Sequence, residues 1–155
     1  MFVNDKWMYK VRDDLSTNSD DIEMLWLEID KDSTGTQRNQ IVGTIYRRPG
    51  SCPTDFNHKL QEILEILSLE NSDIIHMGDY NLNLLSSDTH MPTNEFAEIN
   101  FAQSLFPTIN KPTRITATTA TLIDNIFAPS SVITNCLSGI LMWDISDHFP
   151  VFLVS

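Results

Sequence analysis

Four consecutive residues that could form part of a reactive site follow a short, mostly apolar run at 73–77. They are Gly78, Asp79, Tyr80 and Asn81. On an extended chain Asp79 and Asn81 point the same way, so both can act on one reacting group. Polar residues at the end of a buried strand are typical of sites at the carboxyl edge of open α/β sheets. The alternative is a loop in which both side chains only hydrogen-bond the backbone, as in Asx turns.

Two further carboxylates stand in positions that favour a site. Asp147 directly precedes His148, and a carboxylate near an imidazole fixes its tautomer and raises its proton affinity. Adjacent strand residues point to opposite faces, so this pair shares a site only if the backbone bends, which Ser146 favours. Asp124 interrupts an apolar segment at 121–127, and because an unpartnered buried carboxylate is costly, its apolar neighbours favour a polar site.

A fourth segment, IYRRPG at 45–50, ends an apolar run in a tyrosine and in the only Arg-Arg pair of the chain. Taken separately, Arg47 and Arg48 are expected to lie at a solvated strand end. Tyr46 becomes a candidate site residue only in combination with the three other segments.

Composition limits the functions that these residues can serve. The 155 residues, 41% hydrophobic and 20% charged, predict one soluble globular domain. Lys+Arg 10 against Asp+Glu 21 gives a net charge of −11, which argues against a domain held on nucleic acid by a broad positive field. Cys52 and Cys136 have no metal-type spacing, and neither a signal peptide nor a membrane span is visible, so we expect an intracellular protein of nucleus or cytoplasm.

Hydrophobic periodicity predicts the elements that position these residues in the first half of the chain. A period-2 pattern predicts a half-buried strand within 1–11, and apolar groups on both faces predict a strand over 22–29. Turn residues at 30–39 predict that the next strand, 40–46, forms a hairpin with it. From Pro53 the period becomes helical, with Thr54 as the expected N-cap. The apolar face of this helix comprises Phe56, Leu60, Ile63, Leu64 and Leu67.

The second half is predicted to contain one more helix and then only strands. A buried strand covers 73–77, and a helix capped by Asn94 runs to about Leu105. The later strands are expected at 114–116, 122–127, 132–142 and 149–154. This order indicates an α/β or α+β fold whose sheets are covered by helices, and the apolar groups on both faces of the central strands favour a layered sandwich.

Taken together and in this order, the segments resemble the endonuclease/exonuclease/phosphatase superfamily, most closely the apurinic-type endonuclease domains of non-LTR retrotransposons. The matching segments are IYRRPG (45–50), GDYN (78–81), KPTRIT (111–116), TLIDNIF (121–127) and ISDHFPVF (145–152). Each is weak alone, but their order and spacing cover nearly the whole chain. The resemblance implies a single, partial domain over 1–155, an α/β fold, and a four-layer α/β sandwich of the deoxyribonuclease-I-like type with its first strands missing.

The same resemblance implies hydrolysis of phosphodiesters or phosphomonoesters with Mg²⁺ or Mn²⁺. Asp79 would orient or deprotonate the attacking water, and Asn81 would hold that water or a phosphate oxygen. His148, supported by Asp147 or Asp124, would donate to the phosphoryl oxygens. Carboxylates suit a hard cation such as Mg²⁺, and in-line attack needs an activated water, donors for the equatorial oxygens and a cation for the leaving oxygen.

The remaining roles implied by the resemblance concern the substrate. Tyr46 would hydrogen-bond the scissile phosphate. The candidates for contact with DNA are Arg47, Arg48, Lys111, Thr113 and Arg114.

The resemblance also implies an asparagine and a principal metal-binding glutamate on earlier strands. Neither Asn4 nor Glu23 stands in such a motif, and Glu28 matches a later strand, so no metal ligand is assigned. We therefore expect the C-terminal two-thirds of such a domain, which binds DNA weakly and nicks it poorly or not at all. A reverse-transcriptase domain is the expected partner in a full-length protein, and no membrane partner is expected.

Two alternatives stay open. The net charge of −11 favours a non-nucleic phosphoester as substrate, as in the inositol phosphatases and sphingomyelinases of the same superfamily, whereas IYRRPG and PTRIT favour DNA. A non-catalytic remnant or binding module would keep the scaffold without the reaction. The other histidines, His58, His76 and His90, are expected to be structural or solvent-facing, and Trp7, Trp26 and Trp143 to lie in the core or on sheet faces.

Overall fold

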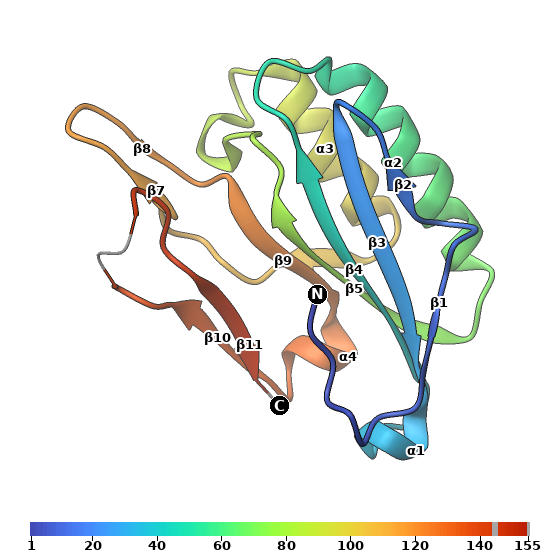
Figure 1. Ribbon diagram of the computed structural model, residues 1–155. Coiled ribbons are helices and arrows are strands. Elements are labelled where there is room, and N and C mark those ends of the chain that lie inside the picture. Colours follow the sequence, from blue (N-terminus) through green and yellow to red (C-terminus); the bar gives the residue numbers. More distant parts are fainter. Residues whose placement is uncertain (144–145, 155) are drawn as a thin grey trace.

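The computed structural model describes residues 1–143 and 146–154, and its main element is a seven-stranded sheet (Figure 1). The strand order is β1-β3-β4-β5-β9-β6, and the short β2 pairs with β3. β4 and β5 are parallel, while the other neighbours in this sheet are antiparallel. The strands are β1 (Tyr9–Val11), β2 (Thr17–Asn18), β3 (Ile22–Ile29), β4 (Asn39–Arg47), β5 (Ser72–Asp79), β6 (Leu105–Pro107) and β9 (Asp124–Pro129).

Two helices, α2 (Pro53–Ser68) and α3 (Met91–Ala102), pack side by side against one face of this sheet (Figure 1). α2 is the crossover that a parallel β4–β5 pair requires. The periodic apolar face of α2 fills the main core, together with Trp26, Ile41 and Phe96, all with no exposed surface. Within the described ranges, no helix has the length and apolar character needed to cross a lipid bilayer.

A smaller layer covers part of the other face of the sheet. Strands β10 (Leu137–Ile140) and β11 (Val151–Val154) pair with each other, and with α4 (Ser130–Ile133) they pack on β5 and β9 through a second apolar cluster. The hairpin of β7 (Arg114–Ile115) and β8 (Ala120–Thr121) and the short turns α1 (Lys31–Thr34) and η1 (Leu84–Ser86) complete the elements. The α/β class is confirmed, and the described residues form three layers: helices, large sheet and small sheet.

Several expected boundaries are wrong. α2 begins at Pro53 after Cys52, so Thr54 lies inside the helix and no side chain caps it. α3 begins at Met91, with proline in its first turn, a position that favours helix initiation; Asn94 therefore lies inside it. α3 ends at Ala102, and Ser104 has a positive φ of 57° that stops the helix before Leu105.

Two expected strands also differ from the structure. The segment 132–142 is divided, because α4 includes Val132 and Ile133, and β10 begins only at Leu137. β1 is exposed along its whole length instead of half-buried. Of the three tryptophans, Trp26 is fully buried as expected, whereas Trp7 is 38% exposed and Trp143 is 68% exposed.

Candidate active site

One row of residues crosses the large sheet where β4 and β5 end, and we call this edge the site end. Tyr46 of β4 pairs with Asp79 of β5, and Asp79 pairs with Asp124 of β9. Residues directly opposite each other in a sheet point to the same face. Because Ile45 belongs to the core under the helices, Tyr46 and its row face away from α2 and α3. The topology therefore brings together three side chains that are far apart in the sequence.

His148 joins this row from the segment that follows β10. One ligand atom each of Asp79, Asp124 and His148 lies within 4.8 Å of the others. Nδ1 of His148 is 3.0 Å from Oδ2 of Asp124 and 3.2 Å from its Oδ1. The side chain of His148 is 32% exposed and that of Asp124 is 16% exposed, so a ligand in solvent can reach the cluster.

Asp147 has a different partner from its neighbour His148. Nε of Arg114 donates to Oδ2 of Asp147 at 2.7 Å, and this ion pair lowers the pKa of Asp147 below its ordinary value. Ser146 Oγ accepts from the backbone N–H of His148, which fixes the turn. The carboxylate that supports His148 is therefore Asp124, and Asp147 orients Arg114 instead. Ile145, the first residue of the matching segment ISDHFPVF, lies outside the described residues.

The backbone around Asp124 is held in place by two residues, Thr113 and Asn83, for which the sequence did not predict this role. The Oγ1 atom of Thr113 accepts from the backbone N–H groups of Ile123 and Asp124, and Oδ1 of Asn83 accepts from that of Leu122. Thr113 has no exposed surface and its hydroxyl is occupied inside the protein, so its contact with DNA stays a prediction that these bonds do not support. For Asn83 the only sequence signal is its position two residues after Asn81 in the same loop.

The GDYN loop combines the two arrangements that the sequence left open. Oδ1 of Asp79 accepts from the backbone N–H of Asn81 at 3.0 Å, and Nδ2 of Asn81 donates to the carbonyl of Arg47 at 2.7 Å. Asn81 has a φ of 48°, so its side chain does not simply follow that of Asp79 as on an extended strand. Burial raises the pKa of Asp79, and the nearby Asp124 carboxylate raises it further, against the Asn81 N–H bond. Asp79 is thus both a turn residue and a member of the cluster.

The two adjacent arginines have opposite environments. Arg47 is 4% exposed, and its guanidinium donates to the carbonyls of Tyr80, Asn81 and Ser51 and to the Ser51 hydroxyl. The expected solvated strand end is therefore wrong for Arg47, which points to the helix side of the sheet, and its contact with DNA stays a prediction. Arg48 is exposed, as expected.

A buried network lies under the loop. Nδ1 of His76 is 2.8 Å from the Tyr80 hydroxyl, and its Nε2 is 2.6 Å from Oδ1 of Asn100 on α3. Burial lowers the pKa of His76 to about 4, so the ring is neutral at pH 7. Because a carboxamide oxygen only accepts, Nε2 carries the proton and Nδ1 accepts from Tyr80. His76 is structural, as expected, and it holds the residue between Asp79 and Asn81.

Among the described residues, Asp79, Asp124 and His148 form the one group of three that can hold a metal ion. Carboxylate oxygens are the protein ligands that Mg²⁺ and Mn²⁺ prefer. Two carboxylates in close proximity repel each other, which is consistent with the raised pKa of Asp79, and a cation between them removes that repulsion. The donor set therefore fits a hard divalent cation.

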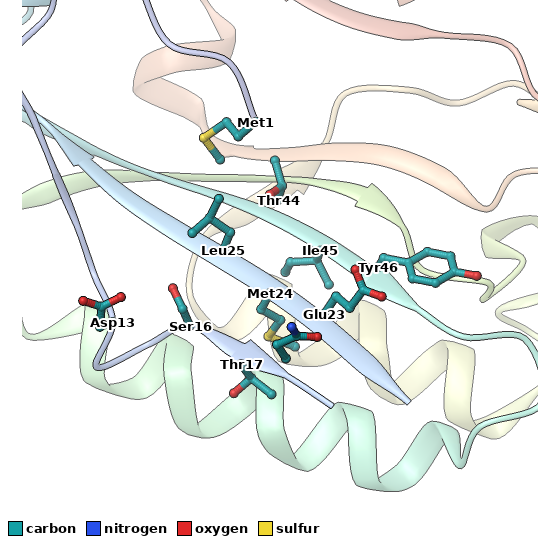
Figure 2. Close-up of a pocket in the computed structure, with 11 residues that line it drawn as sticks. Met1, Asp13, Ser16, Thr17, Glu23, Met24, Leu25, Thr44, Ile45 and Tyr46 are labelled. Carbon is teal, nitrogen blue, oxygen red and sulfur yellow. The ribbon is translucent and has the colours of Figure 1, made fainter. Parts of the chain in front are cut away.

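A cavity of about 530 Å³ adjoins the row at Tyr46. Figure 2 shows residues of β2, β3 and β4 around it, with Met1 above the sheet and the ring of Tyr46 extending away from the other lining residues. Tyr46 is 39% exposed, and no hydrogen bond of its hydroxyl is formed within the described part of the chain. Its hydroxyl is therefore available to a ligand.

The sequence matches no family model, and it matches no curated protein significantly. The structure matches 53 solved chains. The endonuclease domain of TRAS1, a telomere-specific non-LTR retrotransposon, is 13% identical, with a TM-score of 0.75 over 97% of this chain and 69% of that chain.

Two bacterial proteins are similar over less of their length. A 3'-5' exonuclease (NExo) from Neisseria meningitidis is 13% identical, with a TM-score of 0.62 over 83% of this chain and 63% of that chain. An endonuclease/exonuclease/phosphatase family protein from Leptotrichia buccalis is 18% identical, with a TM-score of 0.60 over 85% and 53%. The chain thus spans 53% to 69% of the lengths of these three solved chains. It has the fold of the endonuclease/exonuclease/phosphatase proteins.

Proposed function

We propose that this chain hydrolyses phosphodiesters with a divalent cation, Mg²⁺ or Mn²⁺, and that its substrate is DNA, which it nicks as part of a non-LTR retrotransposon protein. The observation that carries the proposal is the convergence of Asp79, Asp124 and His148 within 4.8 Å at the site end. A reverse-transcriptase domain as partner and a location in nucleus or cytoplasm belong to the same proposal.

Each side chain of the site has a role that its geometry permits. Asp79, whose pKa burial raises, orients and deprotonates the attacking water, and Oδ1 of Asn81 accepts a hydrogen bond from that water. Asp124 binds Nδ1 of His148 and orients the ring so that Nε2 can donate to a phosphoryl oxygen when the ring is protonated. The hydroxyl of Tyr46 donates to the same phosphate.

The carboxylates of Asp79 and Asp124 are the residues that would hold the cation. A divalent cation supplies charge neutralisation at the leaving oxygen of a phosphodiester. No counterpart of the glutamate that the family resemblance implies is assigned in this sequence. We therefore propose that the isolated chain has low affinity for the cation and hydrolyses DNA slowly.

Two observations support DNA over other phosphoesters, and one favours the alternative. Arg48 and Lys111 are exposed, and Arg114, whose side chain is 42% exposed, lies near enough to interact electrostatically with Asp79 and Asp124. A solved structural neighbour, the 3' phosphatase NExo from Neisseria, has a bound product DNA hairpin. The net charge of −11 favours the second candidate, a non-nucleic phosphoester, over the same catalytic residues.

Nicking of supercoiled plasmid in Mg²⁺ and in Mn²⁺ tests the proposal. We expect slow, cation-dependent nicking that falls at least 100-fold in Asp79→Ala and in His148→Ala, a loss typical of general acid–base groups. Asp73→Ala on the same strand and His58→Ala on α2 are matched controls that keep the rate. Nicking that survives in both site variants would contradict the proposal, and faster release of phosphate from inositol phosphates than nicking would favour the second candidate.

A further inference from the structure

A second cavity, of about 600 Å³, lies on the other side of the GDYN loop from the cluster. Its walls contain a guanidinium, an imidazole, hydroxyls and carboxamides but no carboxylate, although the chain has 21 acidic residues. The lining residues are Arg47, Gly50, Ser51, Pro53, Asn81, Leu82, Asn83, Ser86, Thr89, His90 and Thr93. In so acidic a chain, a cavity lined by donors and free of carboxylates is suited to an anion.

The charge in this cavity is that of Arg47, which is 96% buried and lacks a carboxylate partner among the described residues. Four of its five N–H groups donate to neutral oxygens of Ser51, Tyr80 and Asn81, which leaves one N–H on Nη2 without an acceptor in the described ranges. A buried charge that is hydrogen-bonded only to neutral oxygens is costly, and the Asp79 carboxylate acts on this guanidinium only through space, so a bound anion would stabilise it further. The one N–H on Nη2 that has no acceptor in the described ranges could donate to that anion.

Two long helices add to the positive potential here. α2 has 16 residues and α3 has 12, both begin at this cavity, and neither has a side-chain cap. The N-terminus of a helix carries a partial positive charge and free N–H groups that favour phosphate. The partial positive charges of these two helix ends add to the charge of the buried Arg47 guanidinium and favour an anion in the cavity.

The cavity is joined to the catalytic cluster by one residue. Asn81 lines the cavity, and its backbone N–H donates to Oδ1 of Asp79. We propose that this cavity binds a phosphate group of the nucleic-acid strand, a second phosphate beside the one that is cleaved. The proposal rests on the proposed function, and it places Arg47 as a binding residue reached from the cavity instead of from the outer surface.

Binding of a fluorescein-labelled DNA duplex, measured by anisotropy in EDTA and 50 mM salt, tests this site without any hydrolysis. His90→Glu and Thr89→Glu each put a carboxylate into the lining, and we expect each to weaken binding about fivefold or more, because like charges repel across an interface. His58→Glu makes the same change on an exposed position of α2 and should stay within twofold. Far-UV circular dichroism checks that each variant is folded.

Inorganic phosphate distinguishes the possible sources of the anion. In ¹⁵N spectra, we expect the Arg47 Nε–H and the backbone N–H of Thr89 to shift on addition of the duplex in EDTA. A shift with 20 mM inorganic phosphate, absent with sodium chloride of equal ionic strength, shows that the phosphate group alone suffices. A shift with the duplex alone shows that the strand must carry it.

The results separate this inference from the proposed function. Equal loss of binding in His90→Glu and His58→Glu, or no shift at Arg47 with either phosphate source, would overturn the subsite even if plasmid nicking is observed. Loss of binding confined to the cavity variants would support it even if the unchanged chain does not nick plasmid.

Discussion

Two buried arginines stand at opposite ends of the large sheet and differ in their partners. Arg12, 7% exposed, donates to both carboxylate oxygens of Asp14 at 2.9 and 2.8 Å and to both of Glu70 at 2.9 and 2.7 Å. Arg47, 4% exposed, donates only to carbonyl and hydroxyl oxygens. Glu70 precedes the start of β5, whereas Arg47 ends the parallel β4, so the two charges mark the two ends.

The difference separates a structural end from a functional one. At the opposite end, carboxylates neutralise the buried cation, and its interactions are complete within the protein. At the site end, the carboxylates Asp79 and Asp124 lie near each other on one face of the sheet, and the cation Arg47 lies on the other face without them. Carboxylates and a buried guanidinium that lie on either side of one loop, without a hydrogen bond between them, suit a site for a cation and a phosphodiester.

The largest expected effect concerns the backbone of the two ends. A Cβ on Gly78, which has a φ of 154°, would lie 1.7 Å from the carbonyl oxygen of Ile45, so Gly78→Ala must push β5 away from β4. We expect failure to fold or a loss of about 4 kcal/mol in the free energy of unfolding. Gly35→Ala at the opposite end has a φ of 71° and nothing within 4 Å, so it should cost only about 1 kcal/mol. Urea unfolding measures both, and equal losses would remove this contrast.

The next effect comes from His76 beneath the site end. Its pKa is lowered to about 4 by burial, below the ordinary 6.5, so the unfolded state binds the proton more tightly. The contribution of His76 to the free energy of unfolding is fully present above pH 6.5. It falls as the pH decreases toward 4, by about 3 kcal/mol in total. His76→Phe should remove this part of the pH dependence, whereas the exposed His58→Gln should keep it. An unchanged pH slope in His76→Phe, measured by urea unfolding at pH 7 and 4.5, would contradict the buried neutral histidine.

A smaller effect is expected from Arg12. Arg12→Met leaves Glu70 and Asp14 without their cation, and because their side chains are 30% and 57% exposed, solvent limits the loss to about 2 kcal/mol. DNA binding should stay within twofold, because this end has no role in binding. Arg47→Met should reduce both stability and DNA binding. A fivefold loss of DNA affinity in Arg12→Met would show that the two ends are not functionally distinct.

The sequence was sufficient where a local pattern determines the structure. The helical period of Phe56, Leu60 and Leu64 located α2, and apolar groups on both faces and the turn residues at 30–39 located β3 and the hairpin with β4. The GDYN loop was predicted as a site because it follows a buried strand, and Asp124 because a carboxylate in an apolar segment needs a polar partner. The pairing of Asp79 with Asp124 then follows from the register of β5 and β9.

What the sequence did not predict depends on contacts between distant segments. Asp124, and not the adjacent Asp147, supports His148 across 24 residues. Arginine and threonine are usually found at protein surfaces, so the burial of Arg47 and Thr113 was not expected. Their side chains are buried only because the GDYN loop and residues 121–124 pack against them. The division of 132–142 into α4 and β10 likewise follows from the second apolar cluster, which accommodates Val132 from a helix.

Binding of Mn²⁺ is the measurement that tests the site end most directly. Electron paramagnetic resonance of the chain titrated with Mn²⁺ follows the free ion, and it needs no DNA. We predict that the unchanged chain and Asp14→Asn bind one Mn²⁺ with the same affinity, and that Asp79→Asn binds it at least tenfold more weakly. The same affinity in all three proteins would contradict a cation site at Asp79, Asp124 and His148, and with it the proposed hydrolysis.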